Sequence, residues 1–379
     1  IAKLESQLNY DQLLANSIEN NQVVLSYFLK SSDALDDSVS GVLPSPVINN
    51  ELFESTSTIG RKAKGYSANI ELIQNAALDA GHATPQIDPD GIVRRVPMLY
   101  EYDGNYYETL SLVMVRHLLE IEKTEPIFAK SGSSYHGLEK LSLGFIDIPV
   151  NEHTEAFVPY RGKQGSYPYI SATDVIHGRI DKAILKDSIV LVGTTVPGLF
   201  DLRATPVQKQ YAGVEIHANL ISGILDENFK ESPAYVQGIE FIQLLIIGLL
   251  LTLSLPLLSP LWATLFSFII ATSITVLNFS LWQYANLVLP LASNLLLILF
   301  LFIANMSYGF FIERRGKLQI ASTFGQYIPP ELIDEMNFNP DAYTLDAENR
   351  NMTVLFSDVR GFTTISEGLT PAELSELMN

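Results

Sequence analysis

The sequence FIQLLIIGLLLTLSLPLLSPLWATLFSFIIATSITVLNFSLWQYANLVLPLASNLLLILFLFIANMSYGFFI fills positions 241–312 and contains no Asp, Glu, Lys, Arg or His. A bilayer core about 30 Å thick needs about 20 mainly apolar residues for each helical crossing. Polar and proline-containing joints divide the block into three such segments. We predict membrane helices at 239–258, 261–281 and 287–312. The alternative is a buried helical hairpin in a large soluble protein.

Three crossings place the two flanks of this block on opposite sides of the membrane. Both tryptophans, Trp262 and Trp282, fall at the ends of the middle segment, and indole side chains favour the headgroup level. Basic residues follow the third segment at Arg314, Arg315 and Lys317, whereas acidic residues dominate before the first. The positive-inside bias therefore predicts an outside N-terminal flank and a cytoplasmic C-terminal flank. We expect a multi-pass protein of a plasma (bacterial inner) membrane, in contact with membrane lipid.

The composition limits the partners of the flanks. The chain has 379 residues, a formal net charge of -18 and no cysteine. The acidic balance argues against nucleic acid as a partner, and structural disulfides and thiolate metal sites are excluded. Residues 1–234 can form one large domain or two small ones. Because the first residue is Ile1 and no export signal precedes this outer part, we expect a signal or membrane anchor upstream.

Periodicity in residues 1–234 predicts an α/β domain. Apolar residues at helical spacing in 4–19 are followed by a short apolar run at 23–27. The run IVLVGT at 189–194 predicts a buried strand, and 213–225 predicts the last helix. Helices that alternate with strands favour a sheet whose faces are covered by helices.

Two sets of polar residues in this domain are candidates for anion binding. Arg94 and Arg95 follow a Pro-Asp-Gly turn, but neighbouring strand residues face opposite sides. The alternative is that one arginine is solvated and the other is paired to a carboxylate. Gly193, Thr194 and Thr195 could cradle a phosphate, although the full glycine spacing of a nucleotide-binding loop is absent.

Further polar residues follow the predicted strand. Asp201, Arg203 and Pro206 lie where ligands of open α/β sheets tend to bind, and a structural salt bridge is an equal alternative. His217 lies on the last helix among apolar residues, which favours a hydrogen-bonded core histidine over a ligand.

The order of these elements resembles the CHASE domain in its second variety, an extracellular sensor of bacterial receptors. The residues that carry the resemblance are DPDGIVRRVP at 88–97, LKDSIVLVGTTVPGLFDLRATP at 185–206 and YAGVEIHANLISGIL at 211–225, followed by the three apolar segments. The motifs of this family do not specify a signal, so the extracellular ligand stays unknown.

The residues after the third apolar segment form two parts. Residues 313–350 are expected to couple the membrane helices to the C-terminal part, and a passive linker is the alternative. In 351–379, Met352 to Phe356 predicts a strand that ends at Asp358, and Gly361 allows a tight turn before a helix. A further helix is predicted to start with Thr370 as its cap, Pro371 at its first position and Glu373 completing a capping box. A carboxylate beside free N–H groups at a helix start suits a Mg²⁺ ion that is shared with phosphates.

The string from Thr353 to Thr363, TVLFSDVRGFT, closely resembles the opening of the class III nucleotidyl cyclase domain, of the form T-V-L-F-[ST]-D-[IV]-x-G-F-T. The resemblance implies an α+β (ferredoxin-like) domain that uses two Mg²⁺ or Mn²⁺ ions. It implies that Asp358 binds both metals and that the carbonyl of Val359 assists one. It also implies that Phe362 and Thr363 bind the triphosphate, while the backbone N–H groups expected at the turn and helix start, those of Gly361, Phe362 and Thr363, suit phosphate oxygens.

This resemblance also implies a reaction and an assembly. The ribose 3′-OH of ATP would attack the α-phosphate and release pyrophosphate and cyclic AMP, in a site formed between the two copies of a homodimer. Guanylate cyclase activity on GTP is the first alternative, and a receptor module with a degenerate cyclase domain is the second. Because other residues of the family's site do not occur before Asn379, we expect residues 1–379 alone to be inactive.

Sensors of this kind also precede histidine kinases and serine/threonine kinases. All six histidines lie before the first apolar segment, so no phosphoacceptor histidine follows the third segment. No glycine-rich kinase loop occurs either. These observations favour the cyclase.

Overall fold

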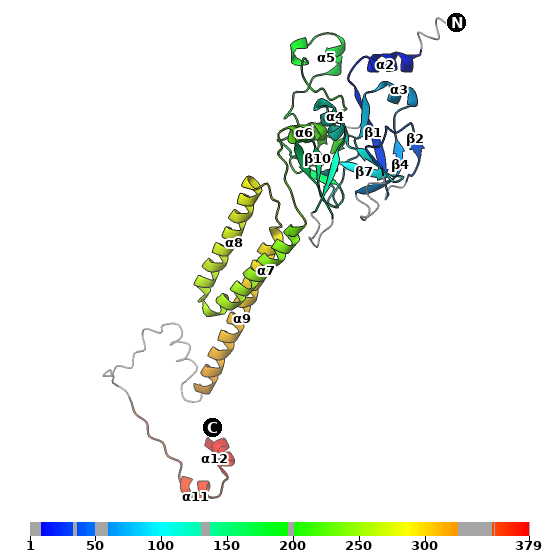
Figure 1. Ribbon diagram of the computed structural model, residues 1–379. Coiled ribbons are helices and arrows are strands. Elements are labelled where there is room, and N and C mark those ends of the chain that lie inside the picture. The colour runs from blue at the N-terminus through cyan, green and yellow to red at the C-terminus, as the bar shows by residue number, and fades with distance from the viewer. Residues whose placement is uncertain are drawn as a thin grey trace. The chain divides into compact units, whose positions relative to one another are not determined.

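The computed structural model describes residues 9–32, 36–49, 60–129, 137–195, 201–324, 351 and 353–378 (Figure 1). The chain divides into two compact units. The first unit contains residues 1–246 and 270–295, and the second contains residues 247–269 and 296–379.

In the described part of residues 1–225, groups of two to four strands lie between successive α-helices. The α-helices there are α2 (Tyr10–Glu19), α3 (Glu71–Ala76), α4 (Leu110–Leu118), α5 (Ala172–Ile176) and α6 (Gly213–Leu225), with a 3₁₀ turn at Lys182–Ile184. The strands are β1 (Val24–Ser31), β2 (Val39–Ser40), β3 (Ile48–Asn49), β4 (Arg61–Ser67), β5 (Asp79–His82), β6 (Arg95–Pro97), β7 (Leu99–Tyr102), β8 (Asn105–Glu108), β9 (Glu125–Phe128), β10 (Leu138–Leu143), β11 (Ile146–Pro149), β12 (Glu155–Phe157), β13 (Leu202–Arg203) and β14 (Tyr211–Ala212). The prediction of a mixed α/β domain is confirmed.

The largest sheet is mixed and has seven strands. Its order is β3-β8-β7-β4-β1-β5, and β2 pairs with β4. β1 is parallel to β5 and antiparallel to β4, and Tyr27 lies opposite His82 in the parallel pair. β9, β10 and β11 form a separate antiparallel sheet. Parallel strands need cover on their faces, and α4 packs against β5.

The main hydrophobic core includes residues of the three-stranded sheet and of the helices α4 and α6. Fully buried members include Leu112 of α4, Leu141 of β10, Ile148 of β11 and Leu220 of α6. The last helix occupies the predicted residues 213–225 because its apolar residues recur at helical spacing on the buried side. The apolar residues of α6 pack against α4 and so position it. α4 also lines a cavity through Val113 and Arg116.

The predicted strand at 189–194 is wrong. Residues 189–195 pair with no strand among the described residues, and the Val192 side chain is 92% exposed. Gly193 lies against Val214 of α6, because a Cβ there would stand 2.6 Å from the Val214 Cβ. A run of β-branched residues becomes a strand only where a neighbouring ladder accepts it, and this segment has none in the described part of the chain.

Three long apolar helices follow, as predicted, with shifted ends. They are α7 (Tyr235–Ser254, with a 3₁₀ turn to Leu257), α8 (Pro260–Tyr284) and α9 (Ala292–Phe324), against the predicted 239–258, 261–281 and 287–312. Their membrane-capable portions have mean hydropathies of 2.1, 1.8 and 1.6.

The ends of these helices differ from the prediction because backbone geometry does not follow hydropathy alone. α7 begins four residues earlier, since Val236 packs with Leu287 and Leu289. α9 begins later because Leu287 instead forms a β-bridge with Glu231, and Pro290 follows it. The coupling segment 313–350 contains the end of α9, and its residues 325–350 lie outside the described residues.

Candidate functional site

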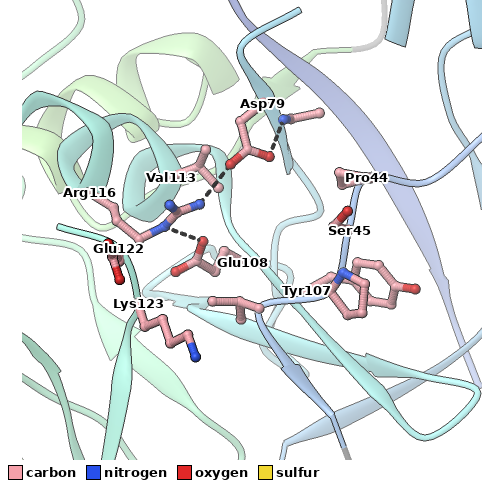
Figure 2. Close-up of a pocket in the computed structure, with 12 residues that line it drawn as sticks. Pro44, Ser45, Asp79, Tyr107, Glu108, Val113, Arg116, Glu122 and Lys123 are labelled. Atoms are coloured by element: carbon pink, nitrogen blue, oxygen red, sulfur yellow. Dashed lines mark hydrogen bonds and ion pairs between the residues drawn. The ribbon is translucent and has the colours of Figure 1, made fainter. Parts of the chain in front are cut away.

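A cavity of about 250 Å³ lies in the first unit beside β5, β8 and α4 (Figure 2). Pro44, Pro46 and Val47 line one wall, and Val113 of α4 lines another. Charged side chains complete the lining from the ends of β5 and β8, from α4 and from the residues after α4. The cavity therefore combines apolar walls with a few convergent polar groups, as ligand sites do.

An ion-pair network forms the buried side of this cavity. Arg116 donates from Nε to Glu108 at 2.9 Å and from Nη2 to Asp79 at 2.7 Å, as Figure 2 shows. The side chains of Arg116 and Glu108 are 11% and 3% exposed. Helix α4 and the adjoining ends of β5 and β8 bring the three groups together from separate parts of the chain.

Further hydrogen bonds hold the two carboxylates in place. Asp79 Oδ2 is 2.8 Å from His117 Nε2, and Asp79 Oδ1 accepts from the Ala80 amide at 2.8 Å. The Thr124 hydroxyl donates to Glu108. Burial raises the pKa of Glu108, and the Arg116 charge opposes that rise.

A tyrosine hydroxyl with no partner lies near this network. The Tyr27 side chain is 2% exposed, and its hydroxyl makes no hydrogen bond within the described part of the chain. Burial raises the pKa of Tyr27 well above its usual value, and Tyr107, Asp79 and Glu108 add to the rise. The hydroxyl therefore lies within electrostatic reach of three residues that line the cavity.

The structure separates the predicted arginine pair. Arg94 binds Asp88 and Asp90, each at 2.7 Å, whereas the Arg95 guanidinium lies over the Phe157 ring at 4.2 Å from its centroid. The Asp90 and Asp88 carboxylates raise the pKa of Arg94. The two arginines therefore do not form an anion-binding pair. Arg94 is paired to carboxylates, as the alternative predicts for one of them, and Arg95 is stacked on an aromatic ring.

The other predicted residues of this domain have structural contacts. Asp201 lies against Gly213, and burial raises the pKa of Asp201 while the nearby Arg203 lowers it. His217 Nδ1 is 2.8 Å from the Ser111 hydroxyl, and burial lowers the pKa of His217 to about 4. His217 is a hydrogen-bonded core histidine, as predicted.

Two sets of contacts lie near the start of the membrane region, one between the segment after α6 and α8 with its following joint, and one between α7 and α9. Lys230 donates to the Trp282 carbonyl and to Asn286 Oδ1, each at 2.7 Å, and its ammonium lies 4.5 Å from the Trp282 ring centroid. Glu240 of α7 accepts from Ser293 of α9 at 2.5 Å. Sequence patterns do not predict these pairs because both are tertiary contacts, and Glu240 directly precedes the charge-free block.

The C-terminal residues form part of the predicted turn. Gly361 has a left-handed backbone (φ 75°) and precedes the short helix α11 (Phe362–Glu367), where the helix start is predicted. The Asp358 carboxylate accepts from the Val359 amide at 2.9 Å, and the Val359 carbonyl accepts from the Phe362 amide at 3.2 Å. Residues 353–357 pair with no strand among the described residues, so the predicted strand is absent here, and Met352 lies outside them.

The next helix begins as predicted. α12 (Pro371–Met378) is capped by Thr370, whose hydroxyl accepts from the Glu373 amide at 3.5 Å and whose amide donates to the Glu373 carboxylate at 2.8 Å. This reciprocal arrangement is a capping box. Within the described ranges, no three His, Asp or Glu side chains are grouped to hold a metal ion.

The three membrane-capable helices and the mixed α/β region before them define a multi-pass membrane protein with a sensor-like domain. The family model of the CHASE2 domain matches residues 2–255, and the chain belongs to that family. CHASE2 is an extracellular sensor domain of receptor-type signalling proteins. No curated protein and no solved structure matches the chain.

Proposed function

We propose that the chain is the sensor and membrane part of a receptor-type class III nucleotidyl cyclase, which makes cyclic AMP and pyrophosphate from ATP. The observation that carries this proposal is the uninterrupted string from Thr353 to Thr363 after three membrane helices. The left-handed Gly361 and the helix start at Phe362 support it, since such a turn presents backbone N–H groups to phosphates.

The C-terminal segment fits a metal-dependent reaction in part. Asp358 is exposed and has carboxylate oxygen free for a cation, and the Val359 carbonyl keeps a second lone pair beside its bond from Phe362. Two such ligands are fewer than Mg²⁺ or Mn²⁺ requires, so substrate phosphates and residues elsewhere in the assembly would complete the set. When bound, two divalent ions would activate the 3′-hydroxyl and stabilise the leaving pyrophosphate.

Different residues of this segment would then bind the cations and the phosphates. Asp358 and the Val359 carbonyl would hold the cations, and the amides of Gly361 and Thr363 would receive phosphate oxygens. The Phe362 amide would join them by exchanging its bond to the Val359 carbonyl for one to a phosphate. The apolar side chains of Leu355 and Phe356 are 88% and 92% exposed, which agrees with a segment whose packing partners lie in the rest of a catalytic domain or in a second copy of the chain.

The orientation in the membrane is part of the proposal. The basic residues Arg314, Arg315 and Lys317 favour a cytoplasmic C-terminal side, where nucleoside triphosphates are available. An outside signal would change the relation of the membrane helices in a homodimer, and residues 313–350 would transmit that change. Lys230 supports this route, because it ties the segment after α6 to the joint between α8 and α9.

Cyclic nucleotide production tests the proposal directly. Membranes that carry the complete protein are supplied with ATP or GTP and with Mg²⁺ or Mn²⁺, beside an Asp358→Asn control. Activity with ATP that disappears in the control is the expected result. Activity with GTP alone would identify a guanylate cyclase, and none with either nucleotide in folded dimeric protein would favour the degenerate receptor.

A further inference from the structure

We propose that the sensor domain responds to acid through two buried histidines, His82 of β5 and His217 of α6. Protons taken up by this pair would release the packing of α4 against β5 and α6. The proposal rests on the sensor role of the domain and names the proton as its signal. It does not depend on the cyclase.

His82 is a buried polar side chain without a partner. It is 0% exposed, and neither ring nitrogen makes a hydrogen bond within the described part of the chain. The ring meets that of Tyr100 edge to face, with the two centroids 5.4 Å apart. Buried polar groups in folded proteins almost always have a partner, so this exception needs an explanation. A phenylalanine would pack in the same way, but only histidine changes its charge near neutral pH.

Both histidines contact the start of α4. The His82 carbonyl accepts from the hydroxyl of Thr109, directly before α4, at 3.2 Å, and the two residues form a parallel β-bridge. His217 Nδ1 is 2.8 Å from the hydroxyl of Ser111, the second residue of α4. The two imidazoles also lie within electrostatic reach of each other. The start of α4 therefore depends on two histidines, one from β5 and one from α6.

A proton on either imidazole would have no counter-charge. Among the described residues, no carboxylate influences the pKa of His82 or of His217. The charged groups on the neighbouring strands and helices have other partners. These pairs are Lys30 with Asp36, Asp79 with Arg116 and His117, Arg116 with Glu108, Lys62 with Glu101, Lys140 with Asp147, and Glu215 with the Gly165 and Ser166 amides. The other titratable groups there are tyrosines, which stay neutral in acid: Tyr27, Tyr100, Tyr102, Tyr106, Tyr107 and Tyr211.

The closed domain therefore resists protonation, whereas an opened one accepts it. Burial lowers the pKa of His82 to about 3, with a smaller contribution from His217, and burial lowers the pKa of His217 to about 4. In an opened state both pKa values return to about 6.5. Because the opened state takes up protons first as the pH falls, acid favours the separation of α4 from the two histidines.

The differences in pKa determine the size of the response. A histidine with a pKa of about 6.5 is almost fully protonated at pH 5, whereas the closed forms of His82 and His217 are still mainly neutral there. Between pH 7.5 and pH 5, each histidine should therefore raise the equilibrium constant for opening about thirtyfold. The pair together should raise it on the order of a thousandfold.

Hydrogen exchange of the full chain in detergent micelles tests the response. The exchange rates of the α4 and α6 amides are measured between pH 7.5 and pH 5, and each is divided by the chemical exchange rate at that pH. We expect this ratio to rise on the order of a thousandfold and to recover at pH 7.5. The ratio should change little in α2, whose buried residues form a separate cluster. Equal opening of α2, α4 and α6 would indicate general acid unfolding and would overturn the proposal.

Variants then assign the response to the two histidines. His82→Leu and His217→Gln should each reduce the rise to about thirtyfold, and the double variant should abolish it. His82→Gln removes the same protonation site with a polar side chain and should match His82→Leu. The matched control is His153→Gln, which should leave the full rise in place because the His153 side chain is 52% exposed. A rise of the original size in the double variant would refute the role of the pair.

The readout involves no nucleotide, so a negative result would not bear on the cyclase.

Discussion

Replacement of Arg116 by methionine should strongly destabilise the sensor domain. The substitution keeps most of the length of the side chain but leaves Glu108, which is 3% exposed, without its counter-charge. Removal of one partner of a buried ion pair costs about 3–5 kcal/mol. We expect about 3 kcal/mol here, at the low end of that range, because Asp79 is partly exposed and retains the contact with His117.

Pulse proteolysis of the full chain across a urea series measures this loss. The matched control is Arg179→Met, since Arg179 forms an exposed pair with Asp174 at 2.7 Å and should cost less than about 1 kcal/mol. The double variant Arg116→Met with Glu108→Gln should recover part of the loss, because the unpaired charge is gone. A cost below about 1 kcal/mol for Arg116→Met, or a double variant as unstable as the sum of the single ones, would refute the reasoning.

Three further predictions concern other parts of the chain. Burial lowers the pKa of His217 from 6.5 to about 4, so the unfolded chain takes up the proton first as the pH falls. The contribution of His217 to stability should therefore decrease below about pH 6.5 by on the order of 3 kcal/mol and level off below about pH 4, as the difference in urea midpoints between the unchanged chain and a His217→Gln variant at each pH would show. Gly41→Ala should cost about 2–5 kcal/mol in the same assay, because φ is +77° and the new Cβ would stand 2.2 Å from the Ala68 carbonyl oxygen. Lys230→Gln should raise the rate of amide hydrogen exchange at residues 286–288 roughly tenfold, because the cation–π contact and the charge-assisted hydrogen bonds are lost. An unchanged exchange rate would contradict this role of Lys230.

The elements that sequence reasoning predicted well are those with a local cause. The three apolar helices follow from a block without charged residues, and α6 follows from apolar residues at helical spacing. The start of α12 follows from Thr370 and Glu373, whose side chains satisfy the first amides of the helix. Each of these signals comes from residues in the helix itself or directly beside it in the sequence.

The candidate site could not be predicted because its residues meet only through tertiary structure. Asp79, Glu108 and Arg116 come from a strand, another strand and a helix, and no spacing in the sequence connects them. The same limit explains the error at 189–194, where strand propensity was strong and no neighbouring strand was available among the described residues. The end of α9 was misplaced because aliphatic composition does not show where a helix ends in polar residues.

The central claim is that the CHASE2 domain and the C-terminal segment lie on opposite sides of a membrane. Because the chain has no cysteine, single cysteines can report the side of each position without background. Asn20→Cys and Glu376→Cys, both at exposed positions, are labelled in intact cells with a membrane-impermeant maleimide. We predict labelling of the Asn20→Cys protein in intact cells and of the Glu376→Cys protein only after permeabilisation. Labelling of both in intact cells, or the reverse pattern, would contradict the account.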